Sequence, residues 1–210
     1  MKTIPLILVM TLIFGNQIFS QTNFPKGTYM SFDELVNKTP SQQYDLKIEK
    51  RTSSDIAMNG GNDYKLVSPD KSLQKKVLKK EVLAHSTGDS LYINCFTYKV
   101  QPWYANVISD GKYLVFRGGI SQDQSERKKQ MKTGYALGAI GGAIQGAKLA
   151  KLRFLYAIDK ETNEVKTITS ENFETLLNQH DNLLEQYKNE TDQDSEETLI
   201  KYLRLLNEAV

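Results

Sequence analysis

Glycine recurs at every fourth position within residues 134–147, GYALGAIGGAIQGA. The repeated positions are Gly134, Gly138, Gly142 and Gly146. Residues four apart are neighbours on a helix, so these glycines would form one smooth face. Each glycine in a helix interior costs about 1 kcal/mol relative to alanine, so such a helix needs a closely packed partner or an apolar solvent. We therefore interpret the stretch as a glycine zipper, a helical element suited to close contact with another surface.

Three interpretations of the glycine stretch are open. It is a helix or hairpin buried against the protein's own sheet, a membrane-surface or membrane-inserting element, or a glycine-rich loop. A simple transmembrane span is disfavoured, because the uncharged run over residues 133–147 is shorter than the roughly 20 residues that a bilayer requires, and it contains Gln145. A phosphate-binding loop has weak support, because no Gly-Lys-Ser or Gly-Lys-Thr accompanies the glycines.

Basic residues flank the glycines on both sides. Before the glycines come Arg127, Lys128, Lys129 and Lys132, and after them come Lys148, Lys151 and Arg153. Long basic side chains beside an apolar element can reach anionic headgroups at a membrane surface. The candidate residues for contact with a membrane or a partner are therefore Gly134, Gly138, Gly142, Gly146, Lys128, Lys129 and Lys148.

Residues 1–20 have the pattern of a cleaved secretory signal peptide. Lys2 gives a basic start, residues 4–18 are almost entirely apolar, and Ser20 is a small residue suited to cleavage before Gln21. The alternative is an uncleaved anchor. We expect an exported protein that is periplasmic, secreted or peripherally associated with a membrane. Cleavage leaves no cysteine at the new N-terminus, which argues against a lipid-anchored protein.

Charge is distributed unevenly along the chain. Residues 21–158 contain 21 Lys and Arg against 12 Asp and Glu, whereas residues 159–210 contain 5 against 13. The two parts therefore face each other or meet different partners, unless both are simply solvated. Expected partners are a membrane surface, an envelope protein or, through head-to-tail association, a second copy. Nucleic acid is not an expected partner of an exported protein.

Short strands separated by turn signals indicate a mainly antiparallel sheet. We expect strands at residues 44–48, 64–67, 91–100 and 113–116, and a hairpin of residues 154–158 and 165–169 with Asn163 in a left-handed turn position. Ser31 should cap a helix at residues 32–37. Residues 58–63, with two glycines, should form a turn. The lysine-rich residues 71–80 are a helix or an edge strand, with a strand favoured in the second half.

Two amphipathic helices are expected at the C-terminal end. The first starts at Ser170, and its apolar stripe contains Phe173, Leu176, Leu177, His180, Leu184 and Tyr187. The second spans residues 196–208. The predicted fold class is α+β, with an antiparallel sheet, a Gly-rich helical segment and these two helices. The predicted organisation is a signal peptide (1–20), a mainly β domain (21–120), the basic-flanked glycine segment (121–152), and a hairpin with two helices on the same domain (153–210).

Four segments of the sequence carry a resemblance to a known family. They are FPKGTYMSFDELVNKTPS (24–41), LAHSTGDSLYIN (83–94), GKYLVF (111–116), and the glycine stretch followed by RFLYAID (153–159). In that order they resemble a family of small exported proteins of unknown function from Gram-negative bacteria. The resemblance implies a cell-envelope setting and brings no activity, catalytic residue or binding residue with it.

Residues with catalytic potential are few. His85 and His180 are the only histidines, and they do not form a pair at metal-ligand spacing. Cys95, the single cysteine, cannot form an internal disulfide, and we expect it to be a buried apolar residue. No cofactor or metal is expected. The sequence therefore favours a non-catalytic binding or structural role in the envelope; the alternative is a small periplasmic hydrolase or ligand-binding protein that uses His85 and carboxylates.

Overall fold

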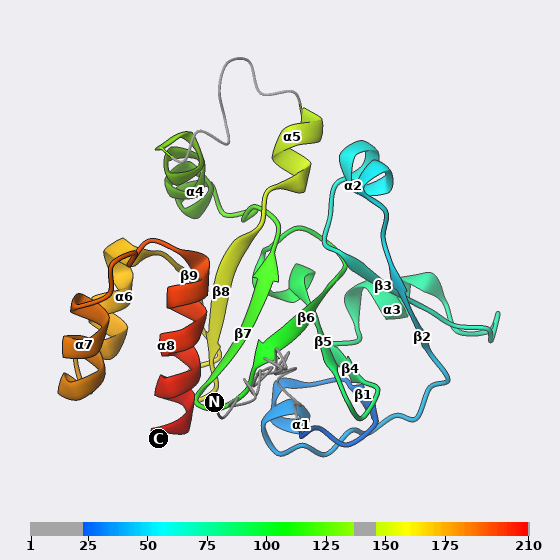
Figure 1. Cartoon of the computed structure of the whole chain (residues 1–210). Coiled ribbons are helices and arrows are strands. Elements are labelled where there is room, and N and C mark those ends of the chain that lie inside the picture. Colours follow the sequence, from blue (N-terminus) through cyan, green and yellow to red (C-terminus); the bar gives the residue numbers. More distant parts are fainter. Residues whose placement is uncertain (1–22, 137–145, 210) are drawn as a thin grey trace, which may run out of the picture.

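The computed structural model describes residues 23–136 and 146–209, which fold into an antiparallel sheet with helices around it (Figure 1). The main path of the sheet has the order β1-β4-β5-β6-β7-β8-β9, and β2 and β3 branch from it. The strands are β1 Gly27–Tyr29, β2 Lys47–Lys50, β3 Tyr64–Val67, β4 Ala84–Ser86, β5 Leu91–Asn94, β6 Tyr104–Ser109, β7 Tyr113–Gly118, β8 Phe154–Asp159 and β9 Val165–Ile168. The predicted α+β class is confirmed.

The sheet forks at β6. Tyr104, the first residue of β6, pairs with Asn94 of β5 on one edge and with Tyr64 of β3 on the other. Further along that second edge, β6 pairs with β7 through Val107 and Phe116, next to a β-bulge. Strands β3 and β7 therefore follow one another along the same edge of β6, and a gap in the backbone ladder opens where they separate.

The helices occupy three places around the sheet (Figure 1). They are α1 Phe32–Val36, α2 Ser53–Asn59, α3 Lys75–Lys80, α4 Gln124–Ala136, α5 Gly146–Lys151, α6 Ser170–Leu177, α7 Asp181–Lys188 and α8 Glu196–Glu208, with a short 3₁₀ helix, η1, at Cys95–Tyr98. Helices α6, α7 and α8 lie beside β7, β8 and β9. Helices α2, α4 and α5 lie together at one end of the molecule, and α1 lies at the opposite end.

Both faces of the paired strands β7 and β8 are buried. Leu114 and Phe116 of β7 pack with Tyr156 of β8 in the core that also contains Tyr29 and other residues of the N-terminal strands. Neighbouring residues point to the opposite face because side chains alternate along a strand. Val115, Leu155 and Ala157 consequently belong to a second core beneath the C-terminal helices.

The C-terminal helices are attached through aromatic residues and one asparagine. The rings of Phe173 and Tyr187 are 5.0 Å apart, and those of Tyr187 and Tyr202 are 5.4 Å apart. Asn207 of α8 accepts a hydrogen bond from the Tyr113 backbone N–H (2.8 Å) and donates one to the Ser109 hydroxyl (2.9 Å). Position 111 must be glycine here, because a Cβ atom would lie 2.4 Å from the Cβ of Asn207.

The C-terminal region contains three helices where the sequence predicted two. The first predicted helix is divided into α6 and α7, and His180, expected within its apolar stripe, is instead the N-cap of α7. Phe173 and Tyr187 are 14 residues apart, which corresponds to about 21 Å along a straight helix. Their 5.0 Å ring separation therefore requires a turn between them. The turn lets both rings enter the same core.

Three other predictions of local structure were wrong. Residues 75–80 form helix α3 and not a strand, because Leu78 is buried against β3 while the lysines around it are mostly solvated. The strand expected at residues 91–100 ends at Asn94, whose side chain accepts a hydrogen bond from the Phe96 N–H (3.2 Å) and starts η1. Helix α2 includes Met58 and Asn59, which were predicted to be in a turn.

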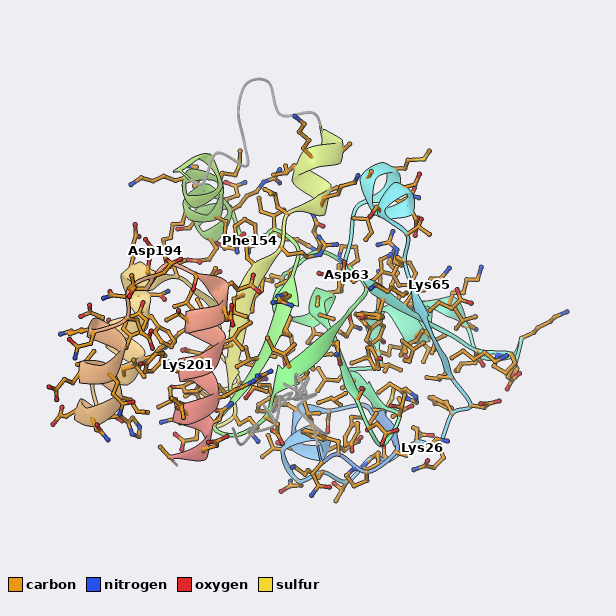
Figure 2. The ribbon with its side chains drawn as sticks, in the orientation of Figure 1. Lys26, Asp63, Lys65, Phe154, Asp194 and Lys201 are labelled. Atoms are coloured by element: carbon orange, nitrogen blue, oxygen red, sulfur yellow. The ribbon has the colours of Figure 1, made fainter. Side chains whose placement is uncertain are left out.

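The uneven charge of the sequence is visible in the structure. Asp194 lies beside the C-terminal helices at the left of Figure 2, whereas Lys26 and Lys65 lie at the right, with Lys65 in strand β3. Arg117 of β7 forms an ion pair with Glu196 of α8, so a basic residue of the first part contacts an acidic residue of the second.

Candidate contact site at the end formed by α2, α4 and α5

The predicted contact residues that the structure describes lie in two helices at the same end of the molecule. Gly134 is in the last turn of α4, and Gly146 is the first residue of α5 (Figure 1). Gly138 and Gly142 lie outside the described residues, so the glycine zipper itself stays a prediction. We call α4 and α5 the two stems, because they are the described helices on either side of residues 137–145.

The first stem, α4, is attached to the sheet by a buried glutamine. Gln130 is 2% exposed, and its amide nitrogen donates hydrogen bonds to the Tyr156 hydroxyl (2.7 Å) and the Thr167 hydroxyl (3.0 Å). Its amide oxygen accepts a hydrogen bond from the Ser121 backbone N–H (2.7 Å). All of these partners lie outside α4, so one side chain joins the stem to β8, β9 and the segment that follows β7.

The start of α4 is capped by Asp123. Its carboxylate accepts hydrogen bonds from the backbone N–H groups of Ser125 (2.9 Å) and Glu126 (3.1 Å). These bonds favour the charged form, and the bond from Glu126 is the main reason why the pKa of Asp123 is below its usual value. Asp123 thus satisfies free N–H groups at the helix start.

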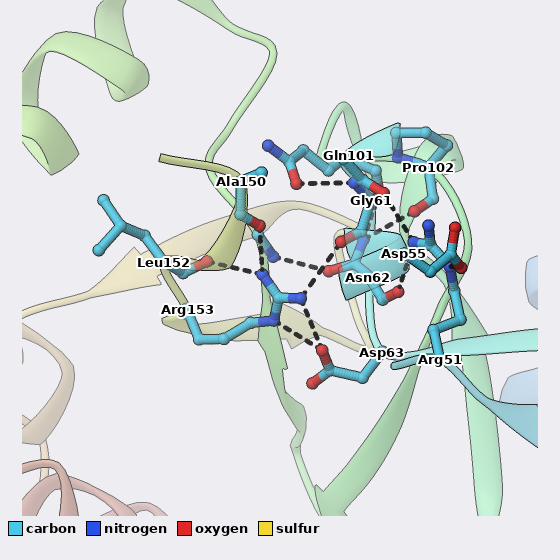
Figure 3. Close-up of polar contacts among 12 residues, drawn as sticks. Arg51, Asp55, Gly61, Asn62, Asp63, Gln101, Pro102, Ala150, Leu152 and Arg153 are labelled. Atoms are coloured by element: carbon cyan, nitrogen blue, oxygen red, sulfur yellow. Dashed lines mark hydrogen bonds and ion pairs between the residues drawn. The ribbon is translucent and has the colours of Figure 1, made fainter. Parts of the chain in front are cut away.

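The second stem, α5, is attached by Arg153, the residue before β8 (Figure 3). Its guanidinium donates hydrogen bonds to one carboxylate oxygen of Asp63, at 2.6 and 2.9 Å, and to the carbonyl oxygens of Ala150 (3.0 Å) and Leu152 (2.8 Å). Carbonyl groups at a helix C-terminus have no partner within the helix. Arg153 therefore holds the end of α5 and ties it to the start of β3.

A second arginine organises helix α2 next to this stem (Figure 3). Arg51 is 7% exposed, pairs with Asp55 at 2.7 Å, and donates to the carbonyl oxygens of Gly60 (2.7 Å) and Asn62 (2.9 Å). The hydrogen bond from Arg51 is the main reason why the pKa of Asp55 is lowered. Because α2 also packs directly against α5, the two helices form one continuous surface.

Asn62 closes the fork between β3 and β7. Its side-chain oxygen accepts a hydrogen bond from the Gly119 N–H (2.6 Å), directly after β7. Its backbone N–H donates to the Pro102 carbonyl (2.8 Å), and its amide nitrogen donates to the Gln101 carbonyl. Asn62 therefore satisfies backbone groups that no neighbouring strand reaches. It holds together the segments from which both stems extend.

The exposed faces of the stems are basic. Lys128, Lys129 and Lys148 are solvent-exposed, as are Lys132 and Lys151. Lys129 pairs with Glu126 at 2.7 Å. Within the described part of the chain, Lys128, Lys132, Lys148 and Lys151 form no ion pair. The structure thus brings three of the predicted lysines, Lys128, Lys129 and Lys148, to the same end of the molecule.

A cavity of about 230 Å³ lies between the stems. Arg127 of α4 lines one side of it, Leu149 and Ala150 of α5 line another, and Gln101 and Gln122 contribute polar groups. A second cavity of about 210 Å³ next to α4 is lined by Asp123 and Glu126 among others. Both are smaller than the usual 300–1,000 Å³ of small-molecule sites. Neither contains His85.

His85 and Cys95 are core residues. His85 in β4 is 3% exposed, and its Nδ1 is 2.9 Å from the Thr28 hydroxyl. Burial lowers the pKa of His85, with a smaller contribution from the charge of Lys26. Cys95 is fully buried, as expected, and burial raises the pKa of its thiol. Its raised pKa disfavours the thiolate that nucleophilic chemistry requires.

The part of the chain that the structure describes contains no group of three or more His, Cys, Asp or Glu side chains that could hold a metal ion. In residues 23–136 and 146–209, no helix is both long and apolar enough to cross a membrane.

Comparison with known proteins gives one match. The model of a family of unknown function, DUF6563, matches residues 27–210. The chain belongs to DUF6563. The expectation of a family of unknown function is therefore confirmed, and the match covers the whole sheet, the stems and the C-terminal helices. No curated protein and no solved structure matches the chain significantly.

The residues that hold this end of the DUF6563 protein together were not predicted from the sequence. Gln130 lies within a run of basic residues and has no periodic pattern around it. Helix α2 did have a signal, because Thr52 is followed three residues later by Asp55, and the Thr52 hydroxyl accepts the Asp55 N–H at 3.1 Å. Because residues 58–63 contain two glycines, a turn was predicted there and the cap was overlooked.

Proposed function

We propose that this DUF6563 protein is an exported protein of the bacterial cell envelope with a non-catalytic binding or structural role. Its contact with a membrane or an envelope partner is made at the end of the molecule formed by the stems and the glycine-rich sequence between them. The signal-peptide pattern of residues 1–20 supports export. The observation that supports the contact is that Gln130 and Arg153 attach the stems to the sheet, while the stem lysines are solvated. Among the described residues, all stem lysines except Lys129 lack an ion pair.

The polarity of α4 supports this assignment. Over residues 124–132 its only apolar residue is Met131, so this part of the helix has no apolar stripe to pack against a core. A helix that is polar all round usually bridges solvent or another body. Gln130 supplies the attachment that an apolar stripe would otherwise give. The remaining surface of residues 124–132 is thus available for a partner.

The hydrolase alternative has no comparable support. His85 is enclosed between β1 and β5, and its hydrogen bond in the described part of the protein is with Thr28 and not with a carboxylate. General acid or base catalysis requires a group that can reach its substrate.

Fractionation of the source cell's envelope tests the proposal. We expect the mature protein to sediment with the membranes at low ionic strength and neutral pH, and Gly138→Leu or Gly142→Leu to release it. His85→Ala is the control and should leave the distribution unchanged. A protein that is soluble in the periplasm or the medium from the start would contradict the proposed contact. Glycine variants that unfold at lower temperature without changing location would assign the glycines to internal packing.

A further inference from the structure

We propose that the end formed by α2 and the two stems is a docking surface for anionic phospholipid, in which Met58 of α2 is the apolar contact and the stem lysines bind the headgroups. This inference rests on the proposed function and names the partner. In this proposal the protein lies on the membrane surface and does not cross the bilayer.

Met58 is the first observation that points to lipid. It is 82% exposed, whereas the other exposed large apolar residues of the described chain, Val36 and Phe96, are 37% and 39% exposed. Met58 belongs to α2, which packs against α5 at the end where the stems lie. A long, flexible apolar side chain standing in water gains free energy when it enters an apolar phase.

The charge of the stems, one of which packs against α2, is the second observation. The stems contain six basic residues, Arg127, Lys128, Lys129, Lys132, Lys148 and Lys151, against the single acidic residue Glu126. Four of these lysines have no ion pair among the described residues. The stems therefore carry a net positive charge that can attract a negatively charged partner.

The acidic residues at this end are all engaged. Asp55 pairs with Arg51, Asp63 with Arg153, and Glu126 with Lys129. Asp123 caps α4. The charges of Asp55 and Asp63 are balanced by arginines, and the six basic residues of the stems outnumber Asp123 and Glu126. A negatively charged surface is the partner that this field attracts.

An anionic membrane fits both observations. An acidic protein surface or a nucleic acid would match the lysines but would leave Met58 without an apolar partner. The interface of an anionic bilayer offers phosphate groups to Lys128 and Lys148 and an acyl region to Met58. Lysines near such a surface attract it with about 1 kcal/mol each, and the attraction is screened by salt.

Vesicle flotation of the full protein, purified after export, tests this assignment. The probes are vesicles of phosphatidylglycerol with phosphatidylcholine, and vesicles of phosphatidylcholine alone. We expect binding to the anionic vesicles only, with weakening as salt rises. Replacing both Lys148 and Lys151 with Gln should weaken the partition roughly 30-fold, the product of two losses of about fivefold each. Met58→Ser should weaken it about tenfold.

The chain offers matched controls for both changes. Lys75→Gln with Lys76→Gln removes two exposed lysines of α3, and Val36→Ser removes an exposed apolar residue of α1, at the opposite end of the molecule. These controls should bind like the unchanged protein. All variants are surface changes, and thermal unfolding checks that each one is folded.

Three results would overturn the lipid assignment: no binding to anionic vesicles, equal binding to both kinds of vesicle, or equal losses in the test and control variants. If the protein binds no vesicle but stays with the envelope until Gly142→Leu releases it, the proposed function stands and its partner is a protein. If it neither binds vesicles nor stays with the envelope, both proposals fail.

Discussion

Two groups of helices are attached to this sheet in different ways. Helices α6, α7 and α8 cover β7, β8 and β9 with a continuous apolar cluster that includes Phe173, Tyr187 and Tyr202. The stems α4 and α5 are attached mainly through polar bonds of Gln130 and Arg153. Of the apolar residues in these two helices whose burial is described, only Ala150 is buried.

The C-terminal helices are therefore part of the stable core, whereas the stems keep a surface that a partner can contact. Apolar burial stabilises in proportion to area, so the C-terminal helices gain stability from many residues at once. A polar anchor stabilises through a few directed bonds, and it leaves the rest of the helix surface in water. The region with few buried apolar contacts is also the one expected to open locally at low cost. A contact surface is best built on such a region.

The largest effect is expected from the aromatic cluster. Phe173→Ala should lower the free energy of unfolding by about 3–5 kcal/mol, because it leaves a cavity against Tyr187 in a fully buried site. Urea unfolding followed by far-ultraviolet circular dichroism measures this loss. Leu176→Ala, at a half-buried position of the same helix, is the control and should cost clearly less. Equal losses would mean that the cluster does not carry the attachment.

A smaller and more local effect is expected from the α4 anchor. Gln130→Ala should cost about 1–3 kcal/mol, because the Ser121 N–H loses its buried partner. Hydrogen exchange should show faster exchange in α4 and unchanged protection in α8. Gln186→Ala, which removes an exposed hydrogen bond to Asn182 on α7, should change neither. Uniformly faster exchange in Gln130→Ala would show that the stem is not a separate unit.

The stability of the sheet, which lies between the two groups of helices, should depend on pH through His85. Its pKa in the folded protein is lowered by burial, whereas an unfolded histidine titrates near 6.5. Between the folded pKa and about 6.5 the unfolded chain binds more protons, so stability falls as pH falls, by up to about 1.4 kcal/mol per pH unit. Urea unfolding between about pH 7 and about pH 5 measures the slope. His85→Asn should flatten this slope.

The smallest effect is expected from the stem lysines. Lys148→Gln together with Lys151→Gln should change the free energy of unfolding by no more than about 0.5 kcal/mol, because both residues are exposed and have no ion pair within the described chain. Thermal and urea unfolding check this. A loss of several kcal/mol would mean that these lysines hold α5 in place, and the contrast between the two helix groups would disappear.

Local features of the fold were predictable from the sequence. Ser31 caps α1 through the Glu34 N–H (3.2 Å), Asn163 has a φ of 58°, and α8 has the predicted bounds. Strand β3 and the β8–β9 hairpin are also confirmed. Each of these depends on residues close together in the chain, whose spacing and backbone preferences act before any long-range contact forms.

The attachment of the stems was not predictable, because it depends on residues far apart in the chain. Gln130 bonds to Tyr156 and Thr167, and Arg153 bonds to Asp63, 90 positions away. Neither Gln130 nor Asn62 has a sequence pattern that distinguishes it from a solvated polar residue. Only the fork of the sheet at β6 makes Asn62 necessary, since it leaves backbone groups that a side chain must satisfy.

By itself, the sequence determined the class of the fold, the caps and turns, and the gathering of glycines and lysines on either side of residue 140. The tertiary structure alone decided that α2 joins the stems, that Met58 is exposed there, and that the first C-terminal helix divides at His180. The physical reason is the range of the interactions. Capping and periodicity act over a few residues, whereas burial and the satisfaction of buried polar groups depend on which distant segments the sheet brings together.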